Sequence, residues 1–146
     1  MEQLQRVLEE TFSANFIAYY RSHVAHVNTT GRNFYADHKL LETIYEYFQD
    51  NIDTLAEKLR TIRATMPDSV ATLTMLSPLV DYPTSGTSEE LLTTVLDAVE
   101  IMIEQYHELN AAAEDVDYID IENFAQDQIG QLAKFRWMLE ATLNEI

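Results

Sequence analysis

The sequence predicts an all-α protein folded as a four-helix bundle. Apolar residues recur at steps of three and four along four long segments, which is the period of helices that bury one face. The chain of 146 residues has only three glycines and three prolines, and all of them except Gly130 lie between those segments. With 47% hydrophobic residues it can form a sizeable core, so we expect a single domain over residues 1–146.

The first two helices are expected over Glu2 to Asn28 and about Asn33 to Ala64, with the break Asn28-Thr-Thr-Gly-Arg-Asn33 between them. The first apolar stripe consists of Leu4, Leu8, Phe12, Phe16, Tyr19 and His23, with Asn15 as a polar exception. The second consists of Leu41, Ile44, Phe48, Ile52, Leu55, Leu59 and Ile62. Both stripes are typical of bundle helices.

A connector from Pro67 to Pro83 follows, with room for one short helix over roughly Asp68 to Leu76. Thr87-Ser-Glu-Glu90 has the pattern of a capping box, so a third helix should begin there and run to about Ala112. Its stripe is Leu92, Val95, Val99, Met102, Ile103 and Tyr106. The acidic break at 114–117 precedes a fourth helix that ends near Asn144. The connector, about 20 residues, can run the length of the bundle, as in ferritin-like folds with one long crossover.

Charge and composition exclude several classes of partner. Nine Lys and Arg residues against 25 Asp and Glu residues give a formal charge of −16, which repels nucleic-acid phosphates and anionic lipids. Without cysteine there is no disulfide or thiolate site, so a metal would have to bind His and carboxylates. The chain has no leader pattern and no apolar run near the roughly 20 residues of a membrane span, so we expect a cytoplasmic protein.

Metal-ligating residue types gather on the second predicted helix. His38 with Glu42, and Asp53 with Glu57, are pairs spaced i,i+4. With His38 at zero on a helical wheel, the other three lie at about 40°, 60° and 100°, whereas the core stripe occupies about 240° to 320°. The four side chains therefore flank the core and face away from the centre of their own bundle.

Distance along the helix predicts that one subunit cannot complete a site. Glu42 and Asp53 are eleven residues apart, roughly 16 Å along the axis. A two-fold dimer whose second helices cross antiparallel near residues 47 and 48 would bring each His38/Glu42 pair to the partner subunit's Asp53 and Glu57, giving two equal sites. His26, expected on the inward arc of the first helix, is a candidate fifth ligand.

The donor set of imidazole and carboxylates suits Fe(II), Mn(II) or Zn(II), and a carboxylate-bridged pair of irons fits it. The same spacing also suits a solvated helix face that pairs with Lys39 and Lys58. Taken alone, His26 could equally be a hydrogen-bonded core histidine. We expect His23 and His107 to be either core histidines of that kind or exposed residues. Spacing by itself leaves both interpretations open.

Two stretches resemble the signature of the Dps family, the mini-ferritins. They are Ala25-His-Val-Asn-Thr-Thr-Gly-Arg-Asn-Phe-Tyr-Ala-Asp-His38 and Ile52-Asp-Thr-Leu-Ala-Glu57, and the match keeps every gap length over about 33 residues. Asp81-Tyr-Pro83 and Lys134-Phe-Arg-Trp137 also agree with that family.

The resemblance implies a ferroxidase centre made by His26, His38 and Glu42 with the partner subunit's Asp53 and Glu57. It further implies that iron(II) is oxidised, by hydrogen peroxide in preference to oxygen, and that the ferric product is stored inside a hollow dodecamer. Zn(II) or Mn(II) would act as substitutes for iron. Removing iron(II) and peroxide together would protect DNA without touching it.

Three features depart from the family pattern. Glu42 is one methylene longer than the usual Asp, which shifts the expected second metal position. Val27 replaces an oxidisable Trp, for which Tyr19, Tyr20, Tyr35 or Tyr45 could substitute if the geometry brings one near. The chain begins Met-Glu-Gln-Leu and ends Leu-Asn-Glu-Ile, without a Lys-rich tail, so direct DNA binding is not expected.

An acidic cluster precedes and enters the fourth predicted helix, formed by Glu114, Asp115, Asp117, Asp120 and Glu122. Its carboxylates could stabilise the positive end of that helix dipole, or they could line a three-fold pore through which Fe(II) enters a shell. The leading hypothesis for the whole chain is therefore a ferroxidase and iron store. The alternatives are a redox-silent structural or metal-binding bundle that uses ion pairs to register a dimer, and, less favoured, a DNA compactor.

Overall fold

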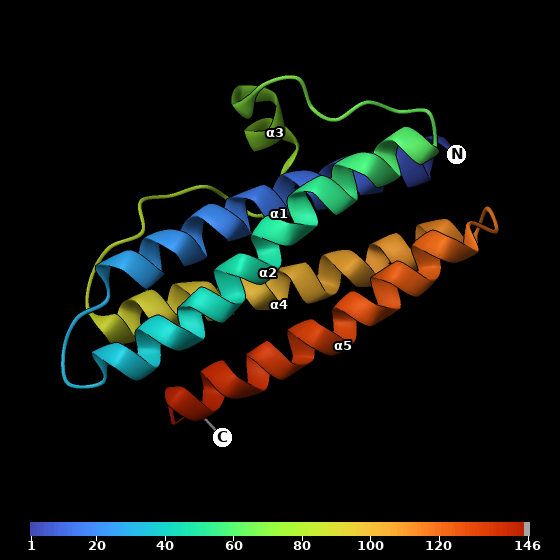
Figure 1. The fold of residues 1–146 in the computed structure, drawn as a ribbon. Helices are drawn as coiled ribbons and strands as arrows, with labels where there is room; N and C mark the ends of the chain where they lie inside the picture. Colours follow the sequence, from blue (N-terminus) through green and yellow to red (C-terminus); the bar gives the residue numbers. More distant parts are fainter. Residues whose placement is uncertain (145–146) are drawn as a thin grey trace.

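The computed structural model describes residues 1–144, which form five helices and no strand. The helices are α1 (Glu2–Asn28), α2 (Phe34–Thr61), α3 (Val70–Leu76), α4 (Ser88–Glu114) and α5 (Ile119–Thr142). Four long helices make the bundle, and the short α3 lies outside it against α1, in a connection from α2 to α4 that runs the bundle's length (Figure 1). The predicted all-α bundle with one long crossover is confirmed.

The predicted apolar stripes form the core. Leu4, Leu8 and Phe12 of α1 are buried, and so are all six stripe residues of α4. On α2 every stripe residue is buried except Ile52, which is half-buried. Each fully buried large apolar side chain contributes about 1.5–3 kcal/mol, so the periodic pattern accounts for most of the attraction between the helices.

The helix ends agree with the sequence to within a few residues, and local contacts explain the differences. The Thr87–Glu90 capping box is present at the start of α4. α2 ends at Thr61, before the expected Ala64, because Arg63 adopts a left-handed φ of 69° and the Ala64 N–H donates to the Leu59 carbonyl instead of continuing the helix. α3 begins at Val70, later than the expected Asp68, because Ser69 caps it through the Thr72 N–H.

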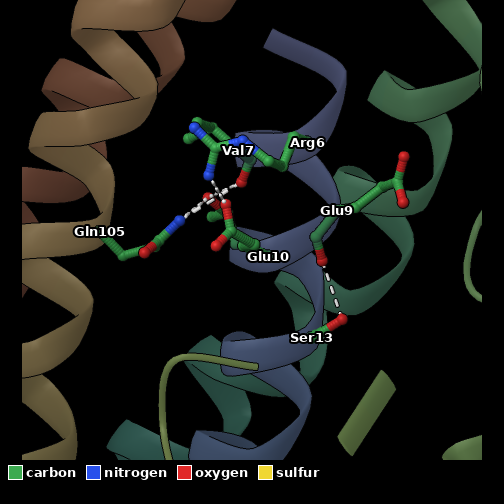
Figure 2. Close-up of polar contacts among 7 residues, drawn as sticks. Arg6, Val7, Glu9, Glu10, Ser13 and Gln105 are labelled. Atoms are coloured by element: carbon green, nitrogen blue, oxygen red, sulfur yellow. Dashed lines mark hydrogen bonds and ion pairs between the residues drawn. The ribbon is translucent and has the colours of Figure 1, made fainter. Parts of the chain in front are cut away.

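Buried polar side chains align α1 with its neighbours. The Gln105 amide of α4 reaches the Val7 carbonyl (3.3 Å) and the Thr11 hydroxyl (3.0 Å) of α1; Figure 2 shows the first of these contacts. Asn15, the polar exception in the first stripe, donates to the Phe48 carbonyl of α2 at 2.8 Å. A hydrogen bond inside a dry core has few alternative partners, so such contacts favour one register between helices.

Arg21 anchors the crossover connection to the bundle. Its guanidinium donates to the carbonyls of Val80 (2.6 Å) and Thr94 (3.2 Å) and lies 4.3 Å from the centre of the Tyr82 ring. Burial lowers the pKa of Arg21, and the nearby Tyr82, Asp97 and Asp81 oppose that shift. No helix in residues 1–144 is long and apolar enough to cross a lipid bilayer.

Candidate metal centre

The turn between α1 and α2 brings two histidines into contact. His26 lies in the last turn of α1 and is buried, and His38 lies near the start of α2 and is half-buried. Their rings stack with centroids 3.8 Å apart and planes 17° from parallel. Glu42 follows one turn after His38, and one ligand atom from each of the three residues lies within 4.8 Å of the others. Within residues 1–144 this is the one such group of three metal-ligating side chains.

Reciprocal hydrogen bonds orient both imidazoles. His26 Nδ1 lies 2.8 Å from the His38 carbonyl oxygen, and His38 Nδ1 lies 2.8 Å from the His26 carbonyl oxygen. A carbonyl can only accept, so in each ring Nδ1 must carry the hydrogen. When such a ring is neutral, its lone pair is therefore on Nε2, which is the state required of a metal ligand.

The alternative interpretation, a solvated helix face that pairs with Lys39 and Lys58, is only partly supported at this site. Lys39 lies 3.7 Å from Glu42, and its side chain is about half exposed, so this pair contributes little to stability. Lys58 instead lies over the Phe124 ring, 4.7 Å from its centre. Glu42 is half-buried and remains within reach of the two histidines.

Asp53 and Glu57 lie apart from that group, as the spacing predicts for a single chain. Both are exposed on α2. A hydrogen bond with Asp53, reinforced by the Asp53 charge, raises the pKa of Glu57, so the pair repels itself when both carboxylates are ionised. A bound cation would relieve that repulsion. The five predicted ligands thus form two separate sets within one chain, and their meeting across a two-fold axis stays a prediction.

A polar cluster holds the α1–α2 turn against the start of α4. The Ser88 hydroxyl donates to the Asp37 carboxylate at 2.9 Å and is also hydrogen bonded to the Thr29 hydroxyl. Asp37 is buried and directly precedes His38. These contacts tie three helix ends together beside the histidines, which restricts the motion of the ligand-bearing backbone.

An aromatic array continues from the histidines along α1 and α2. Tyr45 lies 5.0 Å from His26 and stacks on His23, with centroids 4.0 Å apart and planes 6° from parallel. His23 Nδ1 is 2.9 Å from the Tyr19 hydroxyl. Of the four tyrosines considered as substitutes for the missing Trp, Tyr19 and Tyr45 therefore lie in this array.

The other two tyrosines, Tyr20 and Tyr35, are 60% and 71% exposed. His23 is a hydrogen-bonded, half-buried histidine, as one of the expectations held, and His107 is exposed. The stacking of His23 on Tyr45 joins two helices, so no pattern in the sequence indicates it. The contact of Tyr19 with His23 could have been expected from their i,i+4 spacing.

The acidic cluster divides between two helix ends. Asp120 and Glu122 lie in the first turn of α5, where carboxylates stabilise the positive end of the helix dipole. Glu114 and Asp115 lie at the end of α4, where the dipole disfavours them, and Asp117 has a left-handed φ of 59° in the turn. Helix stabilisation therefore accounts for only part of the cluster.

Comparison with known proteins shows which proteins this chain is similar to. A family model described as a ferritin-like domain matches residues 3–146. A DNA protection during starvation protein of Helicobacter pylori is 29% identical, with 94% of this chain and 96% of that protein covered. A protein of the same name from Brevibacillus brevis is 31% identical, with 99% and 97% covered.

Solved structures of Dps proteins have the same fold. Dps from Thermosynechococcus elongatus matches with a TM-score of 0.92 at 20% identity, over 97% of this chain and 90% of that one. Dps from Vibrio cholerae, described as a member of a broad superfamily of ferritin-like diiron-carboxylate proteins, matches with a TM-score of 0.91 at 23% identity, over 97% and 89%. The chain therefore belongs to the ferritin-like family and, within it, to the Dps proteins.

Proposed function

We propose that this protein is a ferroxidase and iron store, which binds Fe(II) as its substrate at the His26–His38–Glu42 group and keeps the ferric product inside a hollow shell of twelve copies. The observation that carries the proposal is the pair of reciprocal Nδ1–carbonyl bonds, which leave two Nε2 lone pairs beside a carboxylate. Histidines that bind a metal commonly donate their other ring N–H to a backbone carbonyl in this way.

The donor set suits iron in both oxidation states. Neutral imidazole binds Fe(II) well, and carboxylate oxygens hold Fe(III) once it forms. In the proposed dimer the partner subunit's Asp53 and Glu57 add two carboxylates, so that three carboxylates offset the charge of two iron ions. Zn(II) or Mn(II) would bind the same donors as substitutes that block or replace iron.

The proposed reaction uses hydrogen peroxide, the oxidant expected from the family. Two Fe(II) each give one electron, the O–O bond of peroxide breaks, and two protons complete two molecules of water. Both reactants that generate hydroxyl radical are consumed in one step. DNA would then be protected without direct contact, in keeping with the chain's charge of −16.

The acidic turn between α4 and α5 is our proposed route for Fe(II) into the shell. Its carboxylates at Glu114, Asp115 and Asp117 are exposed, and the helix dipole does not account for the first two. Around a three-fold axis such groups would attract cations and repel anions, as acidic rings do in cation channels.

The double variant Asp53→Ala with Glu57→Ala tests the proposed centre. We expect the oligomer to assemble, because neither side chain belongs to the core of its own bundle, while peroxide-driven iron oxidation falls to the protein-free background. Light scattering would measure assembly, and absorbance of the ferric product would measure oxidation. Glu104→Ala with Glu108→Ala is the matched control, since this exposed i,i+4 pair on α4 changes the charge equally. Unchanged oxidation in the first variant would remove the site assignment.

A structural bundle without ferroxidase activity is the second candidate, and the ion pair between Lys39 and Glu42 favours it. Calorimetry with Fe(II) under anaerobic conditions separates the two. A ferroxidase should give a saturable heat of binding at a fixed number of sites per dimer, whereas a redox-silent bundle held by ion pairs should give none.

A further inference from the structure

Lys39 places a positive charge at the edge of the proposed centre. Its Nζ lies 3.7 Å from Glu42 Oε1, three residues further along α2, and the two side chains are 49% and 34% exposed. A helix gains more from a glutamate that precedes its lysine than from this reverse order. The stability of α2 therefore explains little of why the charge lies there.

Lys39 and a metal ion would compete for the same carboxylate. Lys39 directly follows His38, and Glu42 offers a ligand atom within 4.8 Å of those of the two histidines. A positive charge beside a cation site lowers the affinity of that site, because it repels the incoming ion and attracts the same carboxylate. Binding of Fe(II) at Glu42 thus requires that the Lys39 ammonium group gives way.

In the proposed dimer, carboxylates repel one another before iron binds. Glu42 would lie beside the partner subunit's Asp53 and the partner subunit's Glu57, which makes three groups of like charge in one place. Among the ion pairs found in residues 1–144, only that of Lys39 involves any of these three carboxylates. Lys39 is therefore the group that offsets their repulsion while the centre holds no metal.

Lys39 also has a second position to occupy when iron displaces it. Its Nζ lies 5.7 Å from the centre of the Tyr35 ring, one turn earlier on α2. A ring face within about 6 Å attracts an ammonium ion. Tyr35 is 71% exposed, so the displaced lysine stays in contact with water as well. Moving away from Glu42 therefore leaves the charge of Lys39 stabilised.

We propose that Lys39 is the counter-ion of the centre before iron binds, and that Fe(II) displaces its ammonium group from Glu42 toward Tyr35. The inference rests on the proposed ferroxidase function. It makes Lys39 a positioning residue, which acts through Glu42 and does not touch the reacting atoms. Two effects of opposite sign follow: Lys39 weakens the binding of Fe(II), and it strengthens the assembly of the metal-free protein. A centre that must release its ferric product benefits from both.

Lys39→Met tests the inference, because it keeps the length of the side chain and removes its charge. Anaerobic calorimetry with Fe(II) on assembled protein at low salt should give a Kd about two- to fivefold lower than that of the wild type, the range expected of an exposed ion pair. At about 1 M salt, where the Debye length is about 3 Å, this difference should disappear. Lys39→Arg keeps the charge and should stay near the wild-type Kd. Lys134→Met, on an exposed lysine of α5, changes the net charge equally and should have little effect.

Assembly of the metal-free protein gives the second measurement. Light scattering over a dilution series should show that Lys39→Met dissociates at a higher protein concentration than the wild type and Lys134→Met do. Fe(II) should restore its assembly, because the ion then offsets the repulsion between the carboxylates. A lysine that only supported the fold would weaken both binding and assembly when replaced, so the opposite signs identify the counter-ion.

An unchanged or higher Kd in Lys39→Met overturns the inference, as does an equal decrease in Lys134→Met. Metal-free assembly of Lys39→Met as stable as that of the wild type also overturns it. If the wild type binds Fe(II) with a saturable heat and these differences are missing, this inference fails alone. If the wild type gives no saturable heat, the proposed function fails with it.

Discussion

At His26 and His38 a backbone carbonyl, and not a carboxylate, sets the state of each ring. Each Nδ1–H is held by the carbonyl of the other histidine, so both residues depend on the same turn between α1 and α2. A neutral acceptor leaves the imidazole less basic than a carboxylate partner would. The negative charge that binds a cation must then come from Glu42 and, in the proposed dimer, from the partner subunit's Asp53 and Glu57.

Glu42→Gln should therefore weaken Fe(II) binding while leaving the fold intact. The change keeps the side chain's size and removes its charge, and we expect the Kd for Fe(II) to rise about tenfold or more, equivalent to about 1.4 kcal/mol. The lost ion pair with Lys39 should cost well under 1 kcal/mol of stability. Anaerobic calorimetry measures the affinity, with Glu46→Gln, an exposed glutamate one turn later, as the control. Equal weakening in both variants would mean that only general charge matters.

Among the helices, α4 has the best-defined start. Thr87 accepts the Glu90 N–H at 3.2 Å, and the Glu90 carboxylate accepts the Thr87 N–H at 3.1 Å, which lowers the pKa of Glu90. The next residue, Ser88, holds Asp37 beside the histidines. The cap therefore orders both a helix end and one support of the proposed metal centre.

Thr87→Ala should lower the free energy of unfolding by about 1 kcal/mol, because the Glu90 N–H loses its side-chain acceptor. Urea denaturation measures this loss of stability, and Ser85→Ala, which changes an exposed serine just outside the helix, should have almost no effect.

The stabilisation by Glu90 depends on pH. Since the folded state lowers the pKa of Glu90, the contribution of Glu90 to stability is present above the ordinary value of 4.5 and is lost as the pH falls through the lower folded value. The part of the Thr87→Ala effect that comes from the contact of the Thr87 side chain with the Glu90 carboxylate should accordingly be lost in strong acid, while the part from the Glu90 N–H bond remains. An effect that grows in strong acid would contradict this account.

For the molecule as a whole, charge decides which partners are favourable. Each chain carries a formal charge of −16, and in the proposed shell of twelve copies this charge would be repeated twelve times around a small volume. Such a surface attracts cations, including Fe(II), and repels phosphate backbones. The name shared by the similar proteins of Helicobacter pylori and Brevibacillus brevis refers to DNA protection, which peroxide removal could provide without contact.

A gel-shift assay at low salt and without divalent ions should show DNA migrating as free DNA at every protein concentration. Low salt is the condition that most favours phosphate contacts, so the test is stringent. Adding a divalent ion to a parallel sample controls for bridging by metal. Retarded DNA in the metal-free sample would show that a basic surface of the assembly binds DNA despite the net charge.

The sequence by itself determined the helices, the buried stripes and the arc of ligands on α2. These features depend on local periodicity, and so Leu41, Phe48 and Leu59 are buried where the period of 3.6 residues places them. The capping box at Thr87 is equally local. The sequence could not predict Arg21 as the anchor of the crossover or Phe48 as the partner of Asn15, because both contacts join residues far apart in the chain.

Only the tertiary structure decided the chemistry of the centre. Spacing named His26, His38 and Glu42 as candidates, but the tautomer of each ring depends on a carbonyl of the other helix. The stack of His23 on Tyr45 likewise joins α1 to α2, and no periodicity within either helix specifies it. Helix periodicity is a property of neighbouring residues, whereas the direction of a lone pair or the contact of two rings is set by how packed helices meet.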